Sequence, residues 1–295
     1  MKVALATCAE LPHLDGDEAP LVAALASRGV EVRHPAWDAG DAPFLDVDLT
    51  VIRSTWDYTR KAEAFVAWAE RIDAASRGRL CNPAAVVRWN AHKRYLLELQ
   101  RAGVAVVPTR SLPAGSRCDL ARLLGEAGWH GGAVVKPAVS AGSRDSIRVT
   151  RDGLAAAQEH VERLLPTRDL LVQPFVPGIA QGELSLIFVE RAGALSFAHA
   201  VNKVPAAGDF RSQPEFRSQV ERVEPGPAWR AAAERALAEV KAPLLYARVD
   251  LVAGEHGAPW LMELELIEPS LYLGWCPASA ERLADAIVAR AEPLT

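Results

Sequence analysis

Apolar residues recur along the first part of the chain at two spacings, which predict strands alternating with helices. Short apolar runs at 2–7 and 47–53 predict buried strands, and apolar residues three or four positions apart predict helices over 20–28 and 61–75. This alternation is typical of a parallel sheet, in which ligands bind at the carboxyl ends of the strands. Residues 53–58 lie at such an end.

The rest of the chain is predicted to form two further lobes, rich in short strands. Strands are predicted at 133–137, 146–150, 183–190, 194–201, 245–252 and 259–266, and helices at 91–102, 227–240 and 279–291. Residues 202–225 show no periodicity and predict a long loop, which in compact domains is usually functional or disordered. Asn82-Pro83 is a turn signal and marks a candidate lobe boundary.

Composition narrows the class of protein. Lys and Arg number 33 and Asp and Glu 37, a net charge of −4 that argues against a nucleic-acid partner. The chain has neither a membrane-spanning apolar run nor a signal peptide, so we expect a cytoplasmic protein. Its four cysteines are far apart and its seven histidines form no HExxH motif, which argues against disulfides and structural zinc.

The last two predicted strands each place charged residues on one face. Because side chains alternate along a strand, Arg248 shares a face with Asp250, and Glu263 shares one with Glu265. If the two faces coincide, three carboxylates repel one another, and a bound Mg²⁺ would relieve that repulsion. These residues alone favour such a metal site no more than a solvated sheet face, where alternating charge is common.

Two lysines strengthen the case for a phosphate site. Lys136 ends an apolar strand, and Lys93 lies in the first turn of a predicted helix, where backbone N–H groups attract anions. The small-residue loop 138–145 has the composition of a phosphate-binding loop, although most loops of this kind bind nothing. Lysines together with Mg²⁺-binding carboxylates are what a nucleoside triphosphate requires, whereas either lysine alone would be an ordinary surface residue.

The apolar segment 170–176 is a candidate adenine site. Its free backbone groups near Gln173 and Val176 would bind the base, with Phe175 packing against it, and Glu183 would hold a ribose hydroxyl. A plain strand-to-loop exit is the alternative, which these residues by themselves favour. Neither a P-loop motif nor GxGxxG after a strand occurs, which disfavours a P-loop NTPase and a Rossmann dehydrogenase.

Taken in order, these segments resemble the ATP-grasp superfamily, in particular the branch of glutathione synthetase and the RimK-type ligases. The resemblance covers about residues 90–295 and rests on the order and spacing of Lys93, Val134–Pro137, Gln173–Val176, Gly182–Glu183, Asn202–Lys203, Phe210–Arg211, Tyr246–Asp250 and Met262–Ser270. It implies an α/β chain of three lobes, over residues 1–88, 89–172 and 173–295. The N-terminal lobe would contain a parallel sheet, and ATP would bind between the central and C-terminal lobes.

The resemblance also implies a role for each matching residue. ATP would be bound by Lys93, Lys136, Ser140, Gln173, Phe175, Val176 and Glu183. Two Mg²⁺ ions would be held by Asp250, Glu263 and Glu265, and the transferring phosphoryl group would be stabilised by Arg248, Arg211 and Lys203. Two departures stand out: Glu265 occupies a position that is often Asn, and the loop 209–222 carries arginines in place of glycines.

The first ~90 residues, with Ile52–Tyr58 and Asn82-Pro83, resemble a narrower group that includes the O-ureido-serine cyclo-ligases of D-cycloserine biosynthesis. This implies an ADP-forming ligase that makes a C–N bond through an acyl phosphate on a small amino-acid-like substrate. The substrate would be held by Arg53, Ser54, Trp56, Asp57, Glu268 and Ser270. Alternatives are a local ion pair for Arg53 and Asp57 and a packing role for Trp56.

Two other functions stay open at this point. One is an intermolecular amino-acid or peptide ligase with a larger substrate. The other is a non-catalytic nucleotide-binding module, against which the complete set of three carboxylates and two lysines argues. In each case we expect a small-molecule partner, no nucleic acid or membrane partner, and a chain that is a monomer or a homodimer.

Overall fold

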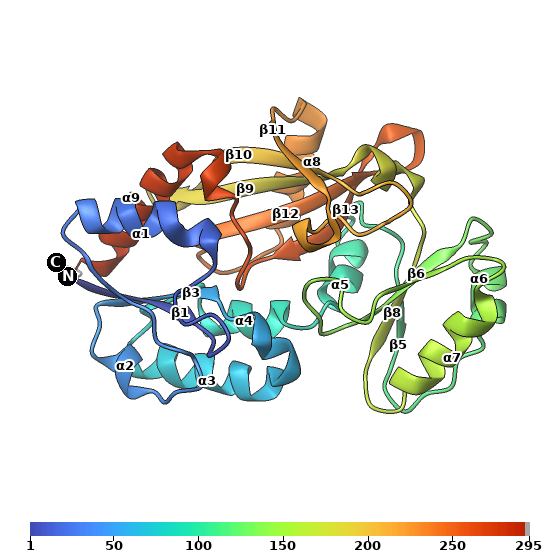
Figure 1. Cartoon of the computed structure of the whole chain (residues 1–295), viewed down its shortest axis with the longest axis horizontal. Helices are drawn as coiled ribbons and strands as arrows, with labels where there is room; N and C mark the ends of the chain where they lie inside the picture. Colours follow the sequence, from blue (N-terminus) through green and yellow to red (C-terminus); the bar gives the residue numbers. More distant parts are fainter. Residues whose placement is uncertain (293–295) are drawn as a thin grey trace.

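The N-terminal lobe is a parallel sheet covered by helices on both faces, in a computed structural model that describes residues 1–292 (Figure 1). The sheet has the order β2-β1-β3-β4, from β1 (Lys2–Thr7), β2 (Glu31–Arg33), β3 (Leu49–Ser54) and β4 (Leu80–Cys81). Alternate residues of β1 face opposite sides: Leu5 packs against α1 (Ala19–Ser27), and Ala6 packs with α3 (Ala62–Ala75). The short helix α2 (Ala42–Leu45) lies beside α3.

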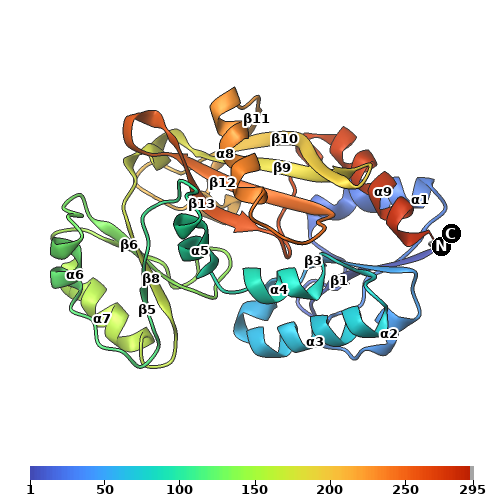
Figure 2. The same ribbon diagram turned by 180° about the vertical axis from the view of Figure 1, so that it is seen from behind.

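The central lobe is an antiparallel sheet with its own core. Its order is β5-β8-β6-β7, from β5 (Arg110–Leu112), β6 (Ala133–Pro137), β7 (Ile147–Val149) and β8 (Leu170–Pro174). Two helices, α6 (Leu120–Glu126) and α7 (Leu154–Leu164), bury Leu120 and Val161 against it. Because this core is separate from the others, the central lobe stands to one side of the molecule (Figure 2).

The C-terminal lobe is a five-stranded antiparallel sheet in the order β11-β10-β9-β12-β13. Its elements are β9 (Glu183–Arg191), β10 (Ala194–Val204), β11 (Gln219–Val223), α8 (Pro227–Leu237), β12 (Tyr246–Ala253), β13 (Pro259–Glu265) and α9 (Pro277–Ala291). The prediction of a continuous loop over 202–225 is wrong, because β10 continues to Val204 and β11 pairs with its edge. Edge pairing supplies the backbone hydrogen bonds there and needs little apolar periodicity in the paired strand.

The helix predicted at 91–102 is present but shorter, as α5 (Tyr95–Arg101), and the unpredicted helix α4 (Ala84–Asn90) precedes it. Lys93 therefore lies in the turn between the two helices and not in the first turn of a helix. Although α5 falls in the range expected for the central lobe, its Tyr95 and Leu99 pack into the core beneath the C-terminal sheet. The N-terminal and C-terminal lobes share a further core, in which Leu21 meets Ile287 and α1 lies beside α9 (Figures 1 and 2). No helix within residues 1–292 is long and apolar enough to cross a membrane.

Candidate functional site

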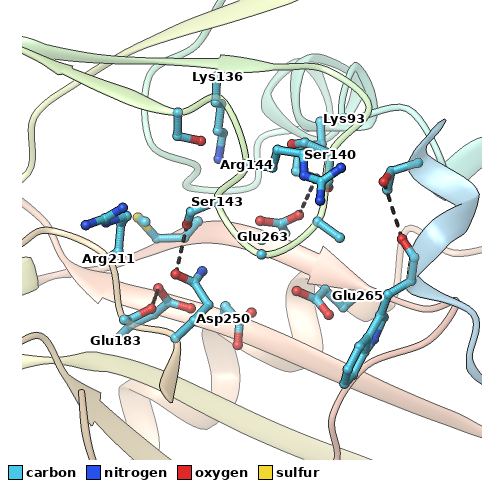
Figure 3. Close-up of a pocket in the computed structure, with 18 of the residues that line it drawn as sticks. Lys93, Lys136, Ser140, Ser143, Arg144, Glu183, Arg211, Asp250, Glu263 and Glu265 are labelled. Atoms are coloured by element: carbon cyan, nitrogen blue, oxygen red, sulfur yellow. Dashed lines mark hydrogen bonds and ion pairs between the residues drawn. The ribbon is translucent and has the colours of Figure 1, made fainter. Parts of the chain in front are cut away.

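All three lobes contribute walls to one cavity of about 340 Å³, within the ~300–1,000 Å³ usual for small-molecule sites. Every residue that the sequence nominated for the site lines this cavity, except Arg53 and Ser54. Figure 3 shows Lys93 and Lys136 on one side of the space and the carboxylates of Asp250, Glu263 and Glu265 on the other. The fold therefore brings together residues up to about 200 positions apart.

The carboxylate side of the cavity is the polar face of the β12–β13 hairpin. In the strand register Asp250 lies opposite Glu263, and Arg248 lies opposite Glu265. Both predicted polar faces thus coincide and line the cavity, which excludes the alternative of a solvated outer face. A shift of register follows Asp250, and Ser185 of the neighbouring strand β9 donates a hydrogen bond to that carboxylate.

Two cations hold Asp250 in its ionised form. Arg248 donates to both carboxylate oxygens at 3.0–3.2 Å, and Nζ of Lys203 lies 3.6 Å from Oδ1. Burial by itself would raise the pKa of Asp250, but the charges of Arg248 and Lys203 outweigh it and leave the pKa at about 2. Glu265 also pairs with Arg248, yet burial and the neighbouring carboxylates raise its pKa to about 7.

These carboxylates suit a hard divalent cation. Three carboxylates line this side of the cavity, and every donor atom that they offer is an oxygen. Within residues 1–292, no three Asp, Glu, His or Cys side chains converge tightly enough to enclose an ion. Mg²⁺ is commonly bound by one or two carboxylates together with phosphate oxygens and water, so an open site of this kind fits it.

The opposite side of the cavity carries the two lysines. Nζ of Lys93 donates to the Ser140 carbonyl at 2.5 Å and pairs with Glu263 at 2.7 Å, so it joins the loop after β6 to the carboxylate face. Lys136 is 9% exposed and has no carboxylate partner among the described residues. Burial lowers the pKa of Lys136, as expected for a cation that lacks a compensating anion.

The predicted adenine segment forms one end of the cavity. Gln173 lies in β8 opposite Val134 of β6, and its side chain donates to Thr109 at 2.9 Å. The ring of Phe175 is covered by the Arg148 guanidinium at 3.8 Å, and Val176 completes this wall. The segment therefore exits the sheet directly into the cavity.

Glu183, nominated for a ribose hydroxyl, is already bound on both oxygens. Oε1 pairs with Lys203 at 2.6 Å, and Oε2 accepts from Ser212 at 2.6 Å. Both Lys203 and Glu183 are buried. This pair ties β9 and β10 to the loop 205–218 at the cavity wall.

The other end of the cavity belongs to the N-terminal lobe. Trp56 and Asp57 lie in a short 3₁₀ helix over Trp56–Arg60, directly after β3. The Trp56 indole donates to the Glu268 carbonyl at 3.1 Å, and Asp57 accepts from Trp37 at 2.8 Å. Burial, reinforced by the charge of Glu265, raises the pKa of the Glu268 carboxyl to about 8. Ser270 lies beside it, and its carbonyl accepts from Arg248.

Arg53 and Ser54 do not have the substrate positions nominated for them. Arg53 is 1% exposed and donates to Glu18 at 2.5 and 2.9 Å and to the Pro269 carbonyl at 2.9 Å. It is thus ion-paired, as the alternative expected, but its partner is Glu18 and not Asp57. Ser54 accepts from the backbone of Asp15. Both side chains contact the segment 15–18 that precedes α1, and neither lines the cavity.

Sequence reasoning missed the contacts that close the cavity mouth. Ser143 donates to Gln213 at 2.8 Å, which joins the loop after β6 to the loop 205–218. Arg144 lines the cavity beside it. Arg211, nominated for the phosphoryl group, also lines the cavity but pairs with Asp209 at 2.7 Å. The small-residue composition of 138–145 and the nomination of Arg211 pointed to this region, but neither identified these contacts.

Comparison with known proteins agrees with this architecture. Residues 3–82 match the N-terminal domain of D-cycloserine synthetase DcsG. The cycloserine biosynthesis protein DcsG of Streptomyces lavendulae is 32% identical in an alignment of 308 positions that covers 99% of both chains.

Solved structures extend the comparison. The crystal structure of D-cycloserine synthetase DcsG superposes with a TM-score of 0.86 at 31% identity, covering 99% of this chain and 100% of that one. A RimK domain ATP-grasp protein from Sphaerobacter thermophilus superposes with a TM-score of 0.67 at 22% identity, covering 97% and 99% of the two chains. The second likeness concerns the fold alone.

Proposed function

The chain belongs to the DcsG family of ATP-grasp ligases, and on that premise we propose that it closes the ring of O-ureido-D-serine to form D-cycloserine with the consumption of ATP. The substrate carboxylate would take the γ-phosphoryl group of ATP, and the substituted nitrogen of the same molecule would displace phosphate from the acyl carbon. The single observation that carries the proposal is that one cavity joins the Lys93–Glu263 pair to Trp56 and Asp57 of the N-terminal lobe.

The N-terminal lobe contributes the end of the cavity farthest from the adenine segment. That lobe is the part of the chain that matches the DcsG N-terminal domain, over residues 3–82. The end is lined by acidic groups, with Asp57, Glu268 and Glu10 opposed by Arg60. An excess of carboxylates suits the ammonium group of an amino acid, so we assign Asp57 and Glu268 to that group.

The chain's own residues would act on the reaction mainly by position and charge. Lys93 and Lys136 would neutralise phosphate oxygens, since both ammonium groups line the cavity opposite the carboxylate face. Arg248, held by Asp250, would face the oxygens of the acyl phosphate. The phosphorus–oxygen bond to ADP breaks as the bond to the substrate carboxylate forms, and the carbon–oxygen bond to phosphate breaks as the carbon–nitrogen bond forms. The nitrogen's proton is released, and the carbamoyl group on that nitrogen is removed by water as carbon dioxide and ammonia, which leaves the ring N–H of D-cycloserine.

Asp250, Glu263 and Glu265 are the residues that would hold Mg²⁺. A bound Mg²⁺ would neutralise the phosphate charge and hold the terminal phosphates in place for transfer.

ADP release measured with ATP and Mg²⁺ over a panel of substrates tests this function. We expect ADP formation with O-ureido-D-serine alone, together with D-cycloserine detected by mass spectrometry. ADP formation that requires two different amino acids, with a peptide as product, would replace the proposal by an intermolecular ligase. A chain that binds nucleotide but forms no ADP with any substrate would be a non-catalytic module. Asp250→Asn serves as the inactive control.

A further inference from the structure

Two of the cations that line the cavity lack an anionic partner. Most cavity cations are ion-paired within residues 1–292, through the pairs Arg60–Glu10, Lys93–Glu263, Lys203–Glu183, Arg211–Asp209 and Arg248–Asp250. In the same described range, Lys136 and Arg144 make neither an ion pair nor a side-chain hydrogen bond. Lys136 is buried and is assigned to phosphate above. Among the described residues, Arg144 is therefore the remaining cation of the cavity lining that has no anionic partner.

The backbone on either side of Arg144 is held in an unfavourable conformation. Ser143 and Asp145 have φ angles of 54° and 57°, in the left-handed region that residues other than glycine rarely adopt. Such residues persist only where surrounding contacts hold them. Here Ser143 donates to Gln213 at 2.8 Å, and the Asp145 carboxylate accepts from Arg168 at 2.6 Å.

The residues on either side of Arg144 are held by these hydrogen bonds, and Arg144 itself lines the cavity. The Ser143 hydrogen bond lies within the cavity lining, whereas Asp145 is held outside it, through its carboxylate by Arg168 and through its carbonyl by His160. Arg144 lines the cavity itself, and Figure 3 shows it on the loop among the residues around Lys93 and Ser140. Contacts on both sides of Arg144 hold the backbone of this loop, and the Arg144 side chain itself is exposed.

The surroundings identify the ligand chemistry. The same loop accepts from Lys93 through the Ser140 carbonyl, and Lys93 pairs with Glu263 on the carboxylate face. A guanidinium in this loop therefore lies over the region between the lysines and the metal-binding carboxylates, where the terminal phosphate of a nucleotide would lie. A planar guanidinium with several N–H donors matches phosphate oxygens well.

We propose that Arg144 binds the γ-phosphoryl group of ATP and stabilises it during transfer to the substrate carboxylate. This inference rests on the ATP chemistry of the proposed function. During the step the γ-phosphorus loses its bond to the oxygen that leaves with ADP and gains a bond to a carboxylate oxygen. Arg144 donates hydrogen bonds throughout and keeps its proton.

Binding of two nucleotides tests the contact without requiring turnover. Titration calorimetry with Mg²⁺ compares ADP with a non-hydrolysable ATP analogue. For Arg144→Ala we expect about tenfold weaker binding of the analogue and less than about twofold change for ADP, because only the analogue carries the γ-phosphate. The matched control is Arg151→Ala, an exposed arginine outside the cavity lining, which should change neither affinity.

Two further variants separate a phosphate contact from an effect on the loop. Ser143→Ala removes the hydrogen bond to Gln213 that helps to hold the loop, but it keeps the Arg144 guanidinium, so it should lower the preference for the analogue less than Arg144→Ala does. Arg144→Lys should recover part of the analogue affinity. An equal loss of ADP and analogue binding in Arg144→Ala, or an unchanged ratio, would overturn the assignment.

Turnover adds a second readout. With the active substrate, Arg144→Ala should lower kcat about a hundredfold, as removal of one transition-state donor commonly does, with KM for the amino acid little changed. If the wild-type chain forms no ADP with any substrate, the proposed function fails, whereas the affinity ratio still decides the role of Arg144.

Discussion

Removing the negative charge of Glu18 should destabilise the protein without damaging its active site. Glu18 and Arg53 form an ion pair whose side chains are 4% and 0% exposed, and Arg53 also bonds to the Pro269 carbonyl. The variant Glu18→Gln keeps the shape of the side chain but leaves a buried guanidinium without a counter-ion. Breaking a buried pair in this way costs about 3–5 kcal/mol of the free energy of unfolding.

The size of the thermal effect follows from the length of the chain. An unfolding entropy of ~2 cal/mol/K per residue amounts to about 0.6 kcal/mol/K over the 295 residues. A loss of 3–5 kcal/mol therefore lowers Tm by about 5–8 °C. An exposed pair gives the matched control: Asp41→Asn breaks the contact with Arg71 and should cost no more than about 1 kcal/mol.

Differential scanning calorimetry and steady-state kinetics, measured well below Tm, provide the assay. KM for the amino-acid substrate should stay within about twofold in Glu18→Gln, because Arg53 lies outside the cavity lining. The double variant Glu18→Gln, Arg53→Met should recover most of the lost stability, since an apolar side chain leaves no buried charge. An unchanged Tm in Glu18→Gln, or a large rise in KM with Tm unchanged, would refute a structural role for the pair.

Three further outcomes are expected. Glu263→Gln should raise the Mg²⁺ concentration needed for half-maximal ADP release and lower kcat at least about a hundredfold, because a proposed metal ligand loses its charge. An unchanged Mg²⁺ titration would contradict the proposed metal site. Trp56→Phe removes the donor to the Glu268 carbonyl, so KM for the amino acid should rise about fivefold while KM for ATP stays constant. Burial lowers the pKa of His199 to about 4, below the ~6.5 of an unfolded chain. Between these two pH values the unfolded state binds more protons than the folded state. The free energy of unfolding therefore falls by up to about 3 kcal/mol as the pH drops from 6.5 to 4. Urea unfolding across this range should show a shallower pH dependence in His199→Gln than in the wild-type chain.

Much of the fold is predictable because its strands and helices bury one regular face. The spacing of Phe65, Trp68 and Ile72 predicts α3, and the structure buries all three against the N-terminal sheet. Alternation also predicts that Arg248 and Asp250 share one face of β12 and that Glu263 and Glu265 share one face of β13, but the register that places Val249 opposite Leu264 comes only from the structure. The edge strand β11 had no such pattern, since its partner supplies the hydrogen bonds and solvent covers its other side.

Within the site, the sequence shows which charged residues share a strand face, but not which of them form ion pairs. The sequence by itself determined the three-lobe order and the two charged strand faces, because side-chain alternation and apolar spacing are local properties. Only the tertiary structure decided that Arg53 is paired with Glu18 and turned away from the cavity, and that Arg144 is presented to it by anchors on two other elements. Such partners come from segments far apart in the chain, and their pairing depends on how the lobes pack, which no local spacing encodes.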